Sequence, residues 1–274
     1  MAEGFDLDIE NDHARIVTVR GAGNNRRPAR RWPGMRIDIW SDIACPWCYI
    51  GLARFEQALA SFAHRDGVEV RLHSFQLDPG LPEVYEGGEA EYLASRKGIP
   101  VEQARQMFAQ VAEAAAGDGL TMDFDALSVA NSRRAHRLLH AARDVSPQAA
   151  WDLERALFGA HFTDGESIAD AEVLVRLAVE AGLDAEAARA ALDDPERDAQ
   201  VAADIAQATR LGIRGVPFFV LAEKYGISGA QPREVFGQAL TQVWDELHPV
   251  VQPLAVPGLE GFGGGAACGP EGCD

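Results

Sequence analysis

Alternating apolar and polar positions predict a strand–helix–strand unit in the first third of the chain. Residues 35–40 alternate and include β-branched side chains, which is typical of a strand, and residues 68–77 repeat the pattern. Between these segments, Leu and Phe recur at helical spacing over about residues 48–63. The sequence His-Arg-Asp-Gly at residues 64–67 separates that helix from the second strand.

A long helical block follows this unit. Residues 78–88 are rich in Gly and Pro and predict a loop, whereas residues 89–211 are rich in Ala, Glu, Arg and Leu and carry few strand signals. Capping residues and prolines mark helix starts within the block. These starts lie at Pro100, Ser146-Pro147, Ser167 or Asp170, Asp184 and Asp194-Pro195. We therefore expect five to seven helices in residues 89–211.

Strand character returns towards the C-terminal end. Residues 218–221 and 225–228 predict two short strands, and a helix follows from residue 232 to about residue 247. A βαβ unit and a ββα unit together form a small α/β sandwich. The expected fold class is therefore α/β, with a large all-helical insertion between the two halves of the sandwich.

This order of elements divides the chain into four parts. They are a flexible N-terminal extension (1–34), a discontinuous α/β domain (35–80 and 212–247), an inserted helical domain (81–211) and a flexible tail that contains cysteines (248–274). Within the extension, residues 14–20 alternate weakly and are compatible with a short strand. The sequence assigns no role to the extension.

Composition and charge narrow the range of functions. The 274 residues are 47% hydrophobic and 24% charged, which is ordinary for a globular protein and excludes a mostly disordered chain. Acidic residues outnumber basic residues by 42 to 25, so the formal net charge is −17. A negative field of this size repels phosphate, and we therefore expect neither nucleic acid nor an anionic membrane as a partner.

The ends of the chain predict a cytoplasmic protein. No apolar run approaches the roughly 20 residues that a membrane-spanning helix needs. The chain begins Met-Ala-Glu-Gly-Phe-Asp, which is acidic where a signal peptide is basic, and no continuous apolar segment or small-residue cleavage site follows. In the cytoplasm, glutathione and thioredoxin keep most thiols reduced.

The four cysteines form two closely spaced pairs, Cys45 with Cys48 and Cys268 with Cys273. In a reducing compartment such pairs favour redox or metal chemistry over structural disulfides. A structural zinc ion held by both pairs is one alternative. Most of the chain separates the two pairs, and we therefore expect no metal site.

The sequence Cys-Pro-Trp-Cys lies where the first strand meets the first helix. Unpaired N–H groups and the dipole at a helix N-terminus stabilise a thiolate, which is the nucleophilic form of cysteine. Cys45 is therefore the expected nucleophile, and Cys48, one turn later, is the expected resolving thiol. We expect Pro46 and Trp47 to tune the redox potential and to contact substrate. The alternative is a pair of buried thiols that are inert or form half of a metal site.

A second signal is the proline that precedes the third strand, in the sequence Val216-Pro217. An X-Pro bond is usually trans, and a cis bond marks a constrained turn. Beside a dithiol we favour a cis Pro217, which would leave the backbone of Val216 free to pair with an extended substrate segment.

Three segments together resemble the DsbA-family oxidoreductases of the FrnE type. They read Trp-Ser-Asp-Ile-Ala-Cys-Pro-Trp-Cys-Tyr-Ile-Gly at 40–51, Gly-Val-Pro-Phe-Phe at 215–219 and Tyr-Gly-Ile-Ser-Gly-Ala-Gln-Pro at 225–232. The resemblance covers about residues 35–247. It implies a thioredoxin-like fold with an inserted helical domain, and catalysis of thiol–disulfide exchange. Cys45, Cys48 and Pro217 match the nucleophile, the resolving cysteine and the cis-proline of that family.

Together with the cytoplasmic location expected from the ends of the chain, this resemblance implies a protein disulfide isomerase or reductase. We expect no bound cofactor beyond the redox-active cysteine pair, with glutathione as a candidate electron donor. The expected partners are substrate proteins or small thiols and disulfides. The oligomeric state stays open, and an apolar face of the helical insertion would allow a homodimer.

The sequence is also compatible with other functions. The architecture also resembles glutathione-dependent 2-hydroxychromene-2-carboxylate isomerases, in which a serine typically takes the position of Cys45. FrnE-type proteins are associated with polyketide pathways, so a small-molecule substrate is a further alternative. A metal-binding redox sensor that uses the tail cysteines is the non-enzymatic alternative.

The tail pair, Cys268 and Cys273, lies in a glycine-rich sequence. A flexible arm with a dithiol reaches another dithiol at high effective concentration. We therefore hypothesise that the tail exchanges electrons with Cys45 and Cys48 or stores oxidation as a disulfide. An idle or metal-prone tail is the alternative.

Three other polar residues are assigned structural roles. Asp42, three residues before Cys45, is interpreted as closing the turn or capping the helix, in preference to moving protons. His136 and His140 have the i, i+4 spacing of metal ligands. Arginines surround them in the sequence, and we interpret them as part of a solvated helix face.

Overall fold

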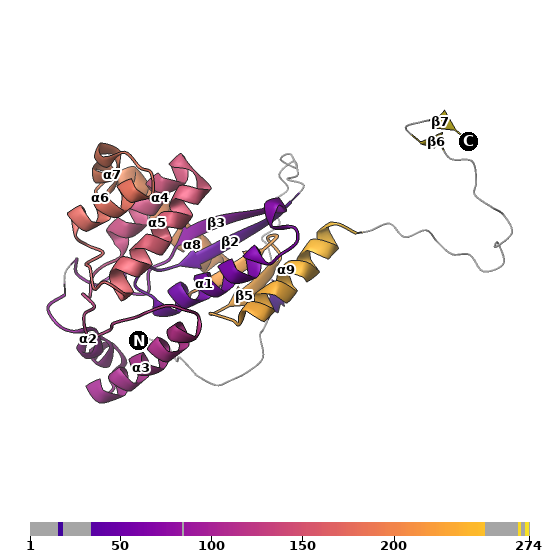
Figure 1. Ribbon diagram of the computed structural model, residues 1–274. Helices are drawn as coiled ribbons and strands as arrows, with labels where there is room; N and C mark the ends of the chain where they lie inside the picture. The colour runs from indigo at the N-terminus through magenta and orange to yellow at the C-terminus, as the bar shows by residue number, and fades with distance from the viewer. Residues whose placement is uncertain (1–15, 19–33, 84, 250–267, 270–271, 274) are drawn as a thin grey trace.

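Up to residue 247 the computed structural model contains the strands and helices in the order expected from the sequence (Figure 1), and two short strands between residues 268 and 273 were not expected. It describes residues 16–18, 34–83, 85–249, 268–269 and 272–273. The strands are β1 (Ile16–Thr18), β2 (Met35–Ser41), β3 (Val68–Ser74), β4 (Phe218–Leu221), β5 (Tyr225–Ser228), β6 (Cys268–Gly269) and β7 (Gly272–Cys273). The helices are α1 (Pro46–Ala60), the 3₁₀ turn η1 (Arg65–Gly67), α2 (Glu89–Lys97), α3 (Val101–Gly117), α4 (Arg133–Val145), α5 (Pro147–Phe162), α6 (Ala171–Glu180), α7 (Ala185–Ala191), α8 (Pro195–Leu211) and α9 (Arg233–Leu247).

Five strands form one mixed sheet in the order β1-β5-β4-β2-β3. β2 and β3 are parallel and α1 connects them, whereas β4 is antiparallel to both β2 and β5. In this register Ile37 lies opposite Val70 on one side and Leu221 on the other. The α/β fold with a helical insertion is therefore confirmed.

The two faces of the sheet follow from the alternation of side chains along each strand. Ile39 and Phe219 belong to the main apolar core, which also contains the inner faces of α1 and α9. Their neighbours Trp40 and Val220 belong to a second, smaller cluster with Ala208 of α8. The sheet is thus covered by α1 and α9 on one face and by α8 on the other.

Seven helices, α2 to α8, separate β3 from β4, within the number expected. Several begin at the predicted capping residues, whose side chains accept backbone N–H groups of the first turn. These caps are Ser146, Asp170, Asp184 and Asp194. The helix α4 is an exception: its N-cap residue, Ser132, makes no side-chain capping bond.

The helical insertion and the sheet share one continuous apolar core. A single cluster of buried side chains runs from Ile37 in the sheet through Phe55 of α1 to Leu157 of α5. Figure 1 shows α4, α5, α6 and α7 gathered at the end of the sheet where β2 and β3 terminate. The inserted helices therefore pack directly against the ends of the strands. The boundaries of the inserted domain, residues 81 and 211, stay a prediction.

Element boundaries differ from expectation by a few residues. α1 begins at Pro46, two residues early, because proline fits the first turn of a helix. β3 ends at Ser74, three residues before the expected end, and the backbone N–H of Leu77 donates to the Asp42 carboxylate at 2.7 Å.

The two ends of the chain are described only in part. The short strand expected within residues 14–20 is present as β1, which pairs with β5. The flexibility expected for the rest of residues 1–34 and for most of the tail concerns segments outside the described residues. None of the helices in the described part of the chain has both the length and the apolar character needed to cross a lipid bilayer.

Candidate active site

Cys45 lies at the junction of β2 and α1, at the N-cap position of the helix. Its backbone is extended (φ −103°, ψ 110°), and its carbonyl accepts the N–H of Cys48 at 3.0 Å. Pro46 occupies the first turn, where its fixed φ favours a helix and its missing N–H costs nothing. The sequence thereby places the Cys45 side chain at the positive end of the helix dipole, which favours a thiolate.

The two sulfurs of the pair lie in different environments. Cys45 is 4% exposed, and Cys48 is completely buried behind it. Burial raises the pKa of the Cys48 thiol well above its usual range, and the hydrogen bond with Cys45 and the charge of Cys45 add to the increase. Cys48 is therefore held as a thiol.

The structure brings Val216 and Pro217 beside the pair, and the peptide bond between them is cis, as expected. The Sγ of Cys45 lies 3.7 Å from the carbonyl oxygen of Val216. The turn after Pro217 is closed by the N–H of Gly229, which donates to the Pro217 carbonyl at 2.9 Å. Cys45 and Val216, which are 171 positions apart in the sequence, therefore lie side by side.

Gly51 permits the close approach of α1 to the Pro217 turn. A Cβ at this position would lie 2.8 Å from Pro217 Cγ and 3.4 Å from Ala230. Arg54 lies three residues further along α1. Its guanidinium donates to the Ala230 carbonyl and to the Asp118 carboxylate, both at 2.7 Å. Gly51 belongs to the segment 40–51 that carries the family resemblance, but neither contact follows from the sequence.

Gly51→Ala is expected to lower the free energy of unfolding by about 1–3 kcal/mol, because the added methyl group overpacks the contact with Pro217. Urea unfolding measures this loss. Gly237→Ala, in α9, is the matched control: nothing lies within 4 Å of its Cβ position, so alanine should stabilise the helix by about 0.5–1 kcal/mol. Equal effects of the two substitutions would contradict the tight contact at Gly51.

Pro46 and Trp47, the expected substrate contacts, are both partly exposed beside Cys45. Trp47 also packs against the main core. The next residue of the helix beyond the pair, Tyr49, stacks on Phe158 of the insertion with ring centroids 5.2 Å apart. An aromatic contact therefore joins the helix that carries the dithiol to the buried Phe158 of α5.

Asp42 closes the turn before Cys45, as expected, but does not cap α1, whose N-cap makes no side-chain bond. Its carboxylate is 1% exposed and accepts the N–H groups of Ala44 and Leu77. Its Oδ1 also lies 3.3 Å from Nε2 of His136. Burial acts to raise the pKa of Asp42, but the His136 contact, the Leu77 N–H and the Ser132 side chain outweigh it and lower the pKa.

The solvated helix face expected for His136 and His140 is wrong. Both are buried, at 1% and 6% exposure, because this face of α4 packs against the ends of β2 and β3. His140 contacts Ser74 and Asp204, each at 3.2 Å. In the described part of the chain, no group of three or more His, Cys, Asp and Glu residues is arranged to hold a metal ion.

A second buried polar network lies under β3. His73 bridges two carboxylates, with Nε2 2.9 Å from Asp38 and Nδ1 3.0 Å from Asp204. Trp40 stacks on the His73 ring at 4.4 Å. Burial acts to lower the pKa of His73, but the two carboxylates outweigh it and raise the pKa. No signal in the sequence identified this network, because its members come from β2, β3 and α8.

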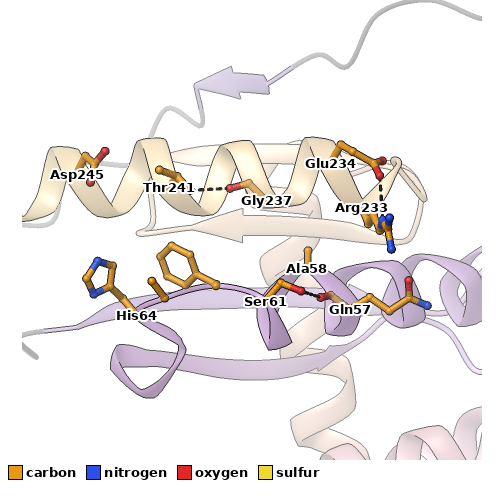
Figure 2. A pocket seen from close by; sticks show the side chains of 11 residues that line it. Gln57, Ala58, Ser61, His64, Arg233, Glu234, Gly237, Thr241 and Asp245 are labelled. Carbon is orange, nitrogen blue, oxygen red and sulfur yellow. Dashed lines mark hydrogen bonds and ion pairs between the residues drawn. The ribbon is translucent and has the colours of Figure 1, made fainter.

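A surface groove of about 550 Å³ lies between the C-terminal part of α1 and α9 (Figure 2). Figure 2 shows Gln57 and Ser61 on the side of α1, facing Gly237 and Thr241 on α9. Neither cysteine of the pair nor Val216 lines this groove. The groove is therefore separate from the candidate active site.

The tail cysteines fall in the two-stranded sheet formed by β6 and β7, where Cys268 lies opposite Cys273. The chain that connects this sheet to α9 lies outside the described residues. The predicted exchange between this pair and Cys45 therefore stays a prediction.

Comparisons with known proteins agree with this geometry. The sequence matches the DSBA-like thioredoxin domain over residues 36–241. A probable DsbA oxidoreductase from Streptomyces coelicolor is 46% identical; the match covers 88% of this chain and 98% of that one, with a TM-score of 0.72. The uncharacterized protein YwbO of Bacillus subtilis is 26% identical over 212 residues, covering 76% of this chain and 96% of that protein.

A similar fold occurs in the cytosolic disulfide reductase DsbM from Pseudomonas aeruginosa, whose structure was solved with glutathione. That chain is 24% identical, and the match covers 76% of this chain and 98% of that one, with a TM-score of 0.54. At this identity the likeness concerns the fold alone.

Proposed function

The chain belongs to the DSBA-like thioredoxin domain family of thiol–disulfide oxidoreductases, and from this premise we propose that it exchanges disulfides through Cys45 and Cys48 in the cytoplasm. One observation carries the proposal. Cys45 is at a helix N-cap and within 3.7 Å of the Val216 carbonyl, with the buried thiol of Cys48 behind it. This asymmetry is what a nucleophile and a resolving thiol need.

The exchange proceeds in two steps in the reductive direction. The Cys45 thiolate attacks one sulfur of a substrate disulfide, which forms a Cys45–substrate bond and releases the other sulfur as a thiolate that takes a proton from water. Cys48 then loses its proton and attacks Cys45, which forms the Cys45–Cys48 disulfide and releases the substrate thiol. The substrate gains two electrons and the dithiol loses them.

We propose that Val216, Pro46 and Trp47 bind the substrate. The backbone of Val216 precedes a cis proline at the edge of the site, where an extended peptide can pair with main-chain groups. Trp47 and Pro46 supply apolar surface beside the attacking sulfur. Recognition through backbone and apolar contacts suits many unfolded or partly folded protein substrates.

A reduced glutathione pool would return the oxidised pair to the dithiol, and we therefore propose reductase or isomerase activity with glutathione as donor. The test is the reactivation of scrambled ribonuclease in a glutathione buffer. Reactivation by the wild type supports the proposal. Absence of reactivation, together with glutathione-dependent turnover of a small disulfide, would overturn the protein substrate and favour a small-molecule substrate instead.

The tail pair gives a separate prediction. If Cys268 and Cys273 exchange electrons with Cys45 and Cys48, the double replacement Cys268→Ser/Cys273→Ser should slow reactivation several-fold at limiting glutathione, because the local dithiol is lost. Redox titration followed by mass spectrometry measures both pairs. An unchanged rate and an unchanged titration of the Cys45–Cys48 pair would reject the exchange.

A further inference from the structure

The turn that carries Val216 lies against one face of α1. Gly51 and Arg54 are three positions apart on this helix, which places them on the same face. A Cβ at Gly51 would lie 2.8 Å from Pro217 and 3.4 Å from Ala230. The backbone of α1 therefore packs against the residue that precedes β4 and against the segment that follows β5.

The guanidinium of Arg54 joins the segment after β5 to the insertion. Its Nη1 donates to the Ala230 carbonyl and its Nε to Oδ2 of Asp118, both at 2.7 Å. Asp118 is the C-cap residue of α3. Both side chains are largely shielded from water, with 20% of Arg54 and 16% of Asp118 exposed. Because a guanidinium is planar and rigid, it fixes the directions of both bonds at once.

Backbone contacts connect Ala230 to the attacking sulfur. Ala230 follows Gly229, whose φ of +77° lies in the left-handed region that glycine adopts without strain. The N–H of Gly229 donates to the Pro217 carbonyl at 2.9 Å. Val216 precedes Pro217, and its carbonyl oxygen lies 3.7 Å from Sγ of Cys45. The position of Ala230 therefore bears on the position of the Val216 backbone beside the sulfur.

We propose that Arg54 is a positioning residue for peptide substrates, which holds the Val216 backbone at a fixed place relative to the Cys45 sulfur. The inference rests on the proposed function, in which an extended substrate pairs with the backbone of Val216. The bonds of Arg54 go to Ala230 and Asp118 and not to the reacting sulfurs. Its contribution is to the placement of the bound disulfide, on which the rate of attack depends steeply.

This role distinguishes two kinds of disulfide. A peptide disulfide that pairs with Val216 is placed by the turn, so it depends on the bonds of Arg54. Hydroxyethyl disulfide has no peptide backbone, so it reacts with Cys45 without that pairing. Loss of the guanidinium should therefore slow the reaction with the peptide and spare the reaction with the small disulfide. A contribution of Arg54 to folding alone would affect both reactions equally.

The test measures the first attack on each disulfide. Fully reduced full-length protein is mixed with an excess of a disulfide-linked peptide dimer or of hydroxyethyl disulfide. The reaction is quenched with acid, free thiols are alkylated, and peptide mapping by mass spectrometry follows the loss of the Cys45 thiol. For Arg54→Met we expect a second-order rate constant at least about tenfold lower with the peptide. With hydroxyethyl disulfide the variant and the wild type should agree within about twofold.

Arg137→Met is the matched control. Arg137 is also 20% exposed, and its guanidinium likewise donates to one carboxylate, that of Asp198, and to one backbone carbonyl, that of Leu192. All three residues belong to the insertion, so both rate constants of this variant should stay within about twofold of the wild type. Arg54→Lys keeps the charge but lacks the planar fork, and its rate constant with the peptide should lie between those of Arg54→Met and the wild type.

Equal rate constants of Arg54→Met and wild type with the peptide, or an equal slowing with both disulfides, would overturn the positioning role. If Arg54→Met does not fold, Arg54→Lys decides. A rate constant at least about threefold lower with the peptide, with hydroxyethyl disulfide unaffected, supports the proposal, and every other pattern overturns it. A wild type whose Cys45 reacts with neither disulfide would remove the proposed function itself, and the role of Arg54 with it.

Discussion

Replacing Cys45 with Ser is expected to lower the rate of disulfide exchange by at least about a thousandfold, since a hydroxyl cannot supply the thiolate nucleophile. The substitution changes one atom at the helix N-cap, and the neighbouring cis turn and buried core remain. The loss should therefore appear in scrambled-ribonuclease reactivation and insulin reduction while the circular dichroism spectrum and the urea midpoint stay close to those of the wild type.

Cys48→Ser gives the informative comparison. Cys45 keeps its helix N-cap and its contact with Val216, so the first attack should survive, while resolution of the mixed disulfide is lost. Substrates should then accumulate as adducts of Cys45.

The Cys45→Ser variant has its own contradicting outcome. Residual exchange above about a tenth of the wild-type rate in that variant would mean that another thiol is the nucleophile.

Asp204→Ala is expected to cost about 3–5 kcal/mol of the free energy of unfolding, because it leaves buried partners unpaired. Asp204 bonds Nδ1 of His73 at 3.0 Å and the backbone N–H of Ser74 at 3.0 Å, and it lies 3.2 Å from His140. Urea unfolding of the full chain measures the loss. Asp198→Ala on the same helix is the control: that side chain is 37% exposed, so its ion pairs should contribute about 1 kcal/mol or less.

The same network predicts how stability depends on pH. Burial acts to raise the pKa of Asp204, but hydrogen bonds from His140 and His73 outweigh it and hold the pKa well below its usual range. Its contribution is therefore present above the unfolded value of about 3.9 and is lost as the pH falls through the folded pKa.

His73 contributes with the opposite sign. Its folded pKa is raised, so its contribution is complete below the unfolded value of about 6.5 and is lost as the pH rises through the folded pKa. The stability difference between wild type and Asp204→Asn should thus be largest between about pH 4 and pH 6.5. A difference that is independent of pH would contradict this account of the network.

The features that the sequence predicts well are local. Cys45 and Pro46 are adjacent, so the strand end, the N-cap and the first helical turn follow from one short segment. The capping aspartates of the insertion, such as Asp184, likewise bond N–H groups two or three residues away. Each of these signals needs no knowledge of the rest of the fold.

The polar groups beneath the site could not be predicted in this way. His136 meets Asp42 across 94 residues, and His73 meets Asp204 across 131 residues. On sequence alone His136 has arginine neighbours and resembles a solvated position, and only the packing of α4 on the strand ends buries it. The contact of Gly51 with Pro217 depends in the same way on two segments that meet only in the fold.

The most direct test of the account is to trap the substrate on the nucleophile. Cys48→Ser is incubated with a peptide disulfide, the free thiols are blocked, and peptide mapping by mass spectrometry locates the adduct. The account predicts a mixed disulfide on Cys45 in near-stoichiometric yield, removed by reductant and absent when Cys45 is also replaced. An adduct on Cys268 or Cys273 with Cys45 unmodified, or no adduct at all, would contradict the assignment of Cys45 as the nucleophile.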